Sequence, residues 1–257
     1  MIAAAWKRAK EILSQSFWRG LIVFLLYVIP IALQLVISHF ILLPYHMAGT
    51  LAAIPLKVDL VLVFVQSMQF IFTLGVIDFT AHRVLGYNVK LAILFSWFSD
   101  GKKIKKLVPY FLLGLGTQTF FVLLDRFFAQ QLPASVQVYM LYVPLVIQIV
   151  VQFMLVSLQF VLVLRRDIPF FKAVRIAVAL TIKNARLILL YYIAQILIGV
   201  ASAAVFVFMS AIPFLYIFCW LFFMPLVLML FFQASFYILL LQRGGLLSEQ
   251  DSVPTNL

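Results

Sequence analysis

Apolar residues in this sequence come in blocks of about twenty, separated by shorter polar or proline-containing stretches. A helix that rises 1.5 Å per residue needs about twenty residues to cross a hydrocarbon core about 30 Å thick. A transmembrane β-barrel would instead show segments of about ten residues with alternating polarity, and that alternation is missing. With 66% hydrophobic and 11% charged residues, the sequence predicts an all-α, polytopic membrane protein that forms one domain over residues 1–257.

The apolar blocks predict six transmembrane helices. They are expected near Leu21–Leu43, Leu60–Phe79, Leu107–Leu124, Val138–Leu164, Leu187–Met209 and Phe214–Leu241. Of the 19 Lys and Arg residues, 17 lie in the N-terminal segment, after the second helix, after the fourth helix or near the C-terminus, whereas Lys57 and Arg126 lie on the opposite side. Because positive residues are retained on the cytoplasmic side, both termini and both basic connections are predicted to face the cytoplasm.

Basic residues recur at a period of about 82 residues. Arg83 and Lys90 are followed 82 residues later by Arg165 and Lys172. The spacing predicts three repeats, each with a cytoplasmic interfacial segment and two helices joined by a short outer turn, over residues 7–83, 90–165 and 172–243. The alternative is that any regular six-helix membrane protein gives similar spacing.

The third interfacial segment has the periodicity of a basic amphipathic helix. At about 100° per residue, its basic residues share an arc of about 80°. They are Lys172, Arg175, Lys183 and Arg186, and the opposite face carries Val174, Val178 and Ile182. Such helices lie in the headgroup plane, so these four basic residues are candidate contacts for lipid headgroups. The alternative is that the helix only packs against the cytoplasmic end of the bundle. The middle segment, 91–98, is apolar all round and fits this pattern poorly.

Ionisable residues are almost missing from the interior of the predicted helices. Asp78 is the deepest acid and lies in the last turn of the second helix, five residues before Arg83. We expect it at the interface, paired with a nearby base, and the alternative is a buried coupling group. Histidines His39 and His46 lie on one side of the membrane and His82 on the other, so no metal site is predicted. Without HExxH, GxSxG or Walker A motifs, no catalytic residue, cofactor or enzymatic activity is predicted either.

Glutamine is the polar residue type that recurs through the predicted helices. An amide costs less in lipid than a charge and can hydrogen-bond to a neighbouring helix, which favours a structural role. The alternative is a polar lining for a substrate path. Together with Asp78, the candidate polar positions in the membrane are Gln34, Gln66, Gln118, Gln148 and Gln195.

The segment before the fifth helix carries a further pattern. The residues Phe170, Phe171, Lys172, Ala173 and Val174, and then 180–184, form a helix that leads through Lys-Asn into the next span. In this pattern and in its six-helix layout, the chain resembles the YciC-type group of uncharacterised bacterial inner-membrane proteins. The resemblance implies a membrane-embedded helical bundle in the inner membrane and contributes no catalytic residues.

Two functions fit these observations. The first is an integral inner-membrane protein in envelope maintenance, or a component that binds lipids or partners; its expected partners are anionic headgroups and other membrane proteins, not nucleic acid, because the net charge of +11 lies beside apolar blocks. The second is a transporter or channel for a small uncharged or lipid-like solute. A transporter should have a polar cavity near the midplane that collects several of the glutamines.

Overall fold

A computed structural model describes residues 1–47, 55–131, 142–165, 167–209 and 215–247, and these ranges are helical with short connections and no strand. In chain order the helices are α1 (Ile2–Met47), α2 (Leu56–Val84), η2 (Leu91–Phe95), α3 (Ser96–Ser99), α4 (Gly101–Gln131), α6 (Tyr142–Leu164), α7 (Phe170–Lys183), α8 (Ala185–Met209) and α9 (Leu215–Arg243). The prediction of an all-α chain is confirmed.

Five of these helices, α1, α2, α4, α6 and α9, contain stretches long and apolar enough to cross a membrane. A sixth is added if α7 and α8, which are bent by 82° at the break between them, count as one span. Each predicted transmembrane helix matches one observed helix, and the predicted end of the fourth at Leu164 is the observed end of α6. The chain is a polytopic α-helical membrane protein.

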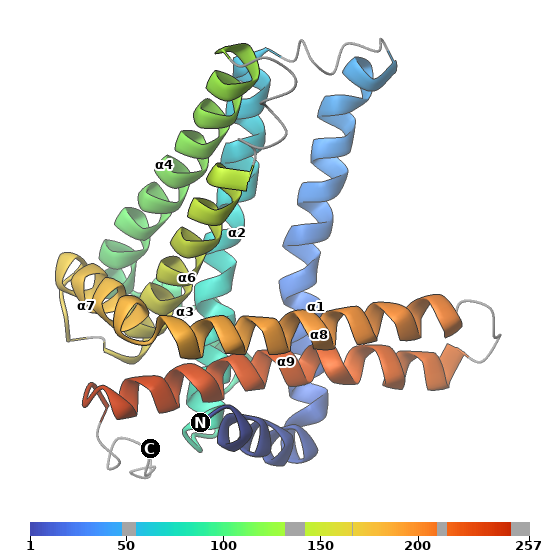
Figure 1. The fold of residues 1–257 in the computed structure, drawn as a ribbon. Coiled ribbons are helices and arrows are strands. Elements are labelled where there is room, and N and C mark those ends of the chain that lie inside the picture. Colours follow the sequence, from blue (N-terminus) through green and yellow to red (C-terminus); the bar gives the residue numbers. More distant parts are fainter. Residues whose placement is uncertain (48–54, 132–141, 166, 210–214, 248–257) are drawn as a thin grey trace.

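The helices are not all aligned. In Figure 1, α1, α2, α4 and α6 run steeply, whereas α8 and α9 lie side by side and run across them. The N-terminal part of α1, η2, α3 and α7 lie at one end of the bundle, which we call the basic end. The three predicted hairpins are present, and the third is oriented differently from the first two. The repeats over 7–83, 90–165 and 172–243 therefore stay a prediction.

Helix α1 is broken at Ser16, whose backbone angles (φ −137°, ψ 20°) are not helical. The part before the break carries buried Ala5, Ala9 and Leu13 on one face and exposed lysines on the other. It crosses the basic end in Figure 1, as expected for an interfacial segment. After the break, α1 continues as a straight apolar helix.

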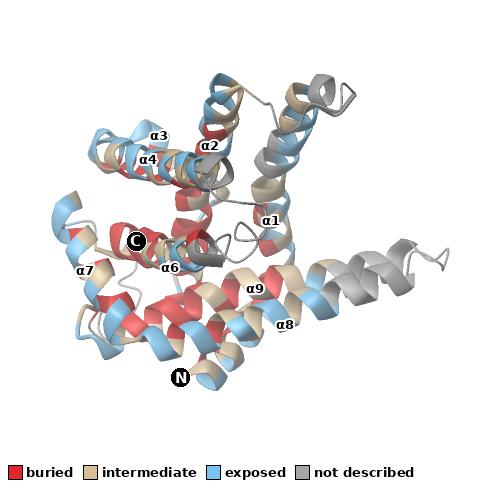
Figure 2. Cartoon of the chain, turned by 45° about the horizontal axis from the view of Figure 1, so that its top comes forward, coloured by how far each residue is buried: buried red, intermediate tan, exposed pale blue. Residues whose placement is uncertain are grey.

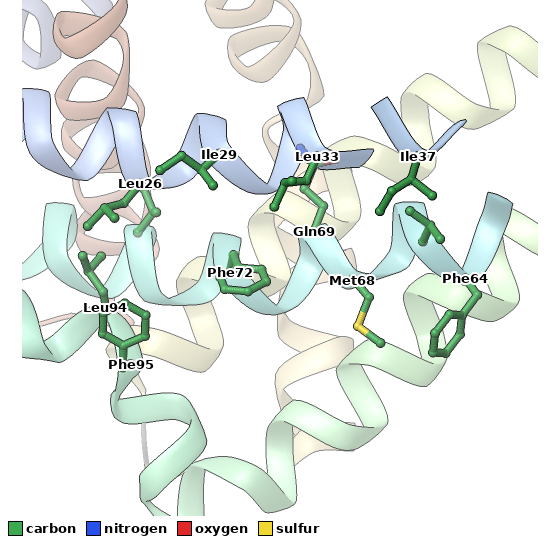
Figure 3. A pocket seen from close by; sticks show the side chains of 12 residues that line it. Leu26, Ile29, Leu33, Ile37, Phe64, Met68, Gln69, Phe72, Leu94 and Phe95 are labelled. Carbon is green, nitrogen blue, oxygen red and sulfur yellow. The ribbon is translucent and has the colours of Figure 1, made fainter. Parts of the chain in front are cut away.

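An apolar cleft of about 400 Å³ separates the distal part of α1 from α2. Figure 3 shows Leu33 of α1 beside Gln69 of α2, with Leu94 and Phe95 of η2 near Leu26 at one end of the cleft. The cleft is open on one side, so its apolar walls are available to a molecule in the bilayer.

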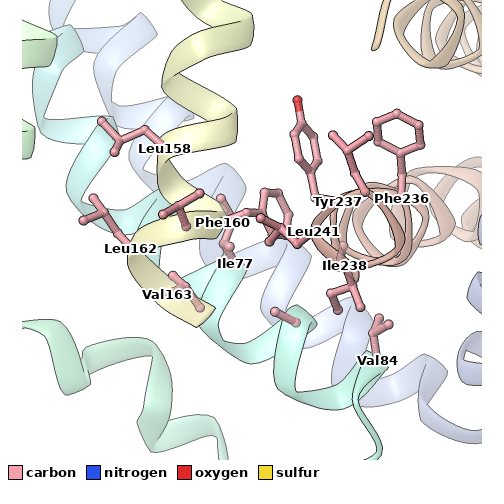
Figure 4. Packing of buried hydrophobic residues seen from close by; sticks show 14 of the residues in the cluster. Ile77, Val84, Leu158, Phe160, Leu162, Val163, Phe236, Tyr237, Ile238 and Leu241 are labelled. Atoms are coloured by element: carbon pink, nitrogen blue, oxygen red, sulfur yellow. The ribbon is translucent and has the colours of Figure 1, made fainter. Parts of the chain in front are cut away.

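The core lies where α9 crosses α1, α2 and α6. Buried residues gather there in Figure 2, and Figure 4 shows Ile77, Phe160 and Tyr237 from three helices packed together. The rings of Phe160 and Tyr237 stack at 4.6 Å. At the crossing of α1 and α9, a Cβ on Gly20 would lie 2.7 Å from Val227 Cγ1, so only glycine allows this approach.

Candidate functional site

Asp78 lies in the C-terminal third of α2 and is fully buried. Its Oδ2 lies 2.9 Å from Nζ of Lys103 on α4 and accepts a hydrogen bond of 3.1 Å from Nε1 of Trp97 on α3. Its Oδ1 lies 2.9 Å from Nδ1 of His82, one turn further along α2. Lys103 Nζ also donates to Ser96 Oγ. We call these five residues the Asp78 cluster.

The Asp78 cluster compensates buried charge. Each carboxylate oxygen of Asp78 has a basic partner, and the ammonium of Lys103 lies 5.5 Å from the Trp97 ring centroid. A buried ion pair is tolerated when its remaining hydrogen-bonding capacity is used in this way. Asp78 is paired with two bases, Lys103 and His82, and is fully buried within the protein. Its position at the membrane interface stays a prediction. The cluster joins α2, α3 and α4 at the basic end.

The middle interfacial segment is η2 followed by α3, and it packs directly against α2. A Cβ on Gly75 would lie 2.2 Å from the backbone oxygen of Leu94, so a glycine at this position lets the two backbones meet. Together with the hydrogen bond from Trp97 to Asp78, this contact holds the segment on α2. The segment is therefore positioned by protein contacts, although it lacks the amphipathic pattern of the other interfacial segments.

Lys103, Trp97 and Ser96 were not among the predicted site residues. The signal for Lys103 was its register: Leu107, Tyr110 and Gly114 follow it at intervals of four, three and four, and all are buried. A lysine in line with a buried stripe indicates a buried charge that needs a partner. No comparable local signal marks Trp97.

The predicted glutamines lie on different helices and do not form one site. Gln66 is exposed on α2, and Gln118, Gln148 and Gln195 are half-buried on α4, α6 and α8. None of these four lines the cavities described here, and the side chain of Gln34 lies outside the described residues.

Several glutamines bond to tyrosine hydroxyls. Gln69 donates to Tyr27 on α1 at 3.4 Å, and Gln159 donates to Tyr110 on α4. The predicted polar position Gln195 donates to Tyr191 of its own helix. Two of these bonds join neighbouring helices, as expected for structural amides. Gln69 also lines the α1–α2 cleft, whose walls are otherwise mainly aliphatic and aromatic.

The surface of α7 has three different faces. One face is buried against the bundle, mainly against α6, and carries Ala173, Ala177, Leu180 and Thr181. A second face is apolar but exposed: Phe171 is 80% exposed and Ile182 is 66% exposed. The third face carries Lys172, Arg175 and Lys183, all exposed. The fourth predicted basic residue, Arg186, is also exposed but lies on α8, beyond the 82° bend. The basic periodicity is as predicted up to Lys183, where α7 ends, and Ile182 of the predicted apolar face is exposed.

A cavity of about 500 Å³ lies beside the basic face of α7, where this helix meets the C-terminal end of α9. Lys183 and Arg243 line it together with Asn184, and Ile176 and Leu246 supply apolar walls. Two cations and an amide beside aliphatic walls are suited to an anionic group that carries an apolar tail.

The histidines show no metal-binding arrangement. His82 is in the Asp78 cluster, His39 lies beside Phe40 on α1, and the side chain of His46 lies outside the described residues. Within the described part of the chain, no three His, Cys, Asp or Glu side chains are close enough to hold an ion.

Comparison of the chain with protein-family models, curated proteins and solved structures finds no match.

Proposed function

We propose that this protein is a non-enzymatic, multi-pass component of a bacterial inner membrane that binds anionic phospholipid headgroups at the cytoplasmic face. The observation that supports this most is the pair of neighbouring exposed faces on α7, one apolar and one basic. A role in envelope maintenance fits a protein whose ligand is the bilayer itself.

The argument rests on what each face of α7 needs. Phe171 and Ile182 are too exposed to be stabilised by the protein, and hydrocarbon is the solvent that suits them. The basic face lies within a quarter turn of them, so its side chains extend toward the headgroups when the apolar face enters the acyl region. The buried face docks on α6, with Ala173 and Ala177 in the contact, and this holds α7 in its orientation.

The basic face predicts a preference for anionic lipids. Changing Lys172, Arg175, Lys183 and Arg186 to glutamine should lower the preference of the protein for phosphatidylglycerol over phosphatidylcholine, because each basic residue near an anionic surface contributes about 1 kcal/mol. With the full-length protein in liposomes, spin-labelled phosphatidylglycerol and phosphatidylcholine are compared. The ratio of their immobilised fractions should fall by at least about threefold in the variant.

A matched control removes the same charge elsewhere at the basic end. Lys7, Lys10, Lys102 and Lys105 are also exposed, so their fourfold glutamine variant loses four charges without altering α7. We expect it to keep most of the preference. Equal losses in the two variants would show a diffuse charge effect and contradict a role for α7.

The orientation in the membrane is a separate prediction. Reporter fusions after Gly101 and Ile168 should report the cytoplasm, and a fusion after Leu132 should report the outer side, because basic residues concentrate near the first two positions. On the outer side, Arg126 Nε donates to Asp59 Oδ2 at 2.6 Å, so its charge is neutralised. A cytoplasmic signal after Leu132 would overturn the assignment.

A further inference from the structure

A second cavity lies at the basic end of the α1–α2 interface. It has a volume of about 550 Å³ and is lined by the residues around the break in α1, from Ser14 to Arg19, and by Arg83 and Asn88 near the end of α2. We call it the arginine cavity. The arginine cavity and the apolar cleft of Figure 3 both lie between α1 and α2.

The cleft and the arginine cavity lie on the same stripes of the two helices. Seven residues make nearly two full turns, so residues at this spacing share a face and are about 10 Å apart along the axis. Both stripes repeat every seven residues: Arg19, Leu26 and Leu33 on α1, and Gln69, Val76 and Arg83 on α2. The two arginines therefore lie about two turns beyond the end of the cleft, on the same helix faces that line it.

The arginines of this cavity have neutral partners. Arg19 Nη1 donates to Asn88 Oδ1 at 2.8 Å, and Arg83 Nη1 donates to the same oxygen at 3.2 Å. Arg83 also donates to Ser16 Oγ, while its buried Nε has no hydrogen-bond partner. None of the described residues that line the cavity is acidic. Two guanidinium groups thus meet on one amide oxygen without a counter-charge.

Phosphate is the group that this arrangement suits. Guanidinium groups bind phosphate oxygens through pairs of hydrogen bonds, and an anion between Arg19 and Arg83 would relieve their mutual repulsion. Trp18 is 64% exposed beside Arg19, as is typical of a tryptophan at headgroup level. The arginine cavity therefore lies at the depth where phospholipid phosphates lie.

The length of the cleft fits one leaflet. From Leu26 to Ile37 along α1 is eleven residues, or about 16 Å of helix, which is close to half of a hydrocarbon core about 30 Å thick. An acyl chain that starts below the arginine cavity would run along the cleft and end near the middle of the bilayer.

We propose that the α1–α2 groove is a binding site for one acidic glycerophospholipid, with its phosphate held by Arg19, Arg83 and Asn88 and an acyl chain in the apolar cleft. This site is distinct from α7, whose basic face contacts the surrounding headgroups. It would hold a single lipid in a fixed position.

The test uses phosphatidylglycerol that carries a diazirine in one acyl chain. The full-length protein is reconstituted in phosphatidylcholine liposomes with a small fraction of this probe, irradiated and digested, and the labelled peptides are identified by mass spectrometry. Label should concentrate on residues 26–37 and 64–76. Diazirine-bearing phosphatidylcholine should label these segments on the order of tenfold less, because it carries no net negative charge.

Three variants make the result specific. Changing Arg19 and Arg83 to glutamine should lower labelling of the cleft by phosphatidylglycerol on the order of tenfold. The control Lys7→Gln with Lys10→Gln removes two exposed charges from the same end and should leave labelling unchanged. Leu33→Trp should fill the cleft and lower its labelling while both arginines stay in place. This variant tests the site independently if the arginine variant folds poorly.

Several outcomes would overturn the proposal. Equal labelling by the two lipids would mean that the cleft contacts bulk bilayer lipid without selecting a headgroup. Unchanged labelling of the arginine variant would exclude the arginine cavity as the phosphate site. Displacement of the probe by excess inorganic phosphate would point to a free anion instead. Since the fourfold α7 variant should leave this labelling intact, failure here and failure of the α7 proposal are distinguishable.

Discussion

Asp78→Asn is expected to destabilise the folded protein by about 3–5 kcal/mol, because it leaves the buried ammonium of Lys103 without a counter-charge. Lys103 is only 8% exposed, so water cannot replace the lost carboxylate. For a chain of this size the change corresponds to a fall in Tm on the order of 10 °C. Thermal unfolding of the detergent-solubilised full-length protein measures it.

Two further variants decide whether the buried pair is the cause. Adding Lys103→Met to Asp78→Asn removes both charges, and the double variant should be more stable than Asp78→Asn alone. The control is Asp59→Asn, which breaks the pair with Arg126 where both side chains are partly exposed and should cost about 1 kcal/mol or less. If Asp78→Asn were as mild as Asp59→Asn, the Asp78 cluster would not be holding the basic end together.

Gly75→Ala should also be strongly destabilising. A methyl group there would lie 2.2 Å from the backbone oxygen of Leu94, and a backbone atom cannot rotate away as a side chain does. The segment from η2 to α3 would have to move off α2, which would stretch the bond between Trp97 and Asp78. We expect a loss of about 2–4 kcal/mol, measured in the same unfolding experiment.

The matched control for this glycine is on α4. A Cβ on Gly116 would have no atom within 4 Å, so Gly116→Ala should be neutral or stabilise the helix by up to about 1 kcal/mol. A neutral Gly75→Ala would mean that η2 does not rest on α2. Trp97 fluorescence offers a second readout, since displacement of α3 would expose its ring to water.

Local features of this fold could be predicted from the sequence because they depend on neighbouring residues. The length of an apolar block sets the length of a helix, so α6 and α8 lie close to their predicted bounds. The basic face of α7 also depends only on helical periodicity, and Lys172, Arg175 and Lys183 are exposed on it. The break that places Arg186 on α8 was not predicted.

The docking face of α7 could not be predicted from hydrophobicity alone. The amphipathic pattern favours burial of the largest aliphatic residues, yet Ala173 and Ala177 face the bundle while Ile182 faces outward. In a membrane, lipid satisfies bulky apolar side chains as well as protein does, and small residues allow helices to approach closely. The docking face of α7 is thus marked by its small residues, Ala173 and Ala177, rather than by the highest hydrophobicity.

The partners of Asp78 and Arg19 could not be predicted for a different reason. Asp78 is 25 residues from Lys103, and Arg19 is 69 residues from Asn88, so nothing in either local pattern reveals the pairing. The crosswise course of α8 and α9 likewise depends on contacts of α9 with α1 and α2. Sequence periodicity identifies faces, whereas the choice of neighbour is set by tertiary packing.

The order of residues in the Asp78 cluster affects how the chain is made. Asp78 leaves the ribosome before Trp97 and Lys103, and at about 5–20 residues per second Lys103 follows a few seconds later. During that interval the carboxylate has only His82 from its own helix. A chain that stops after Val84 would lack Trp97 and Lys103, so this acid would keep only the partner from its own helix.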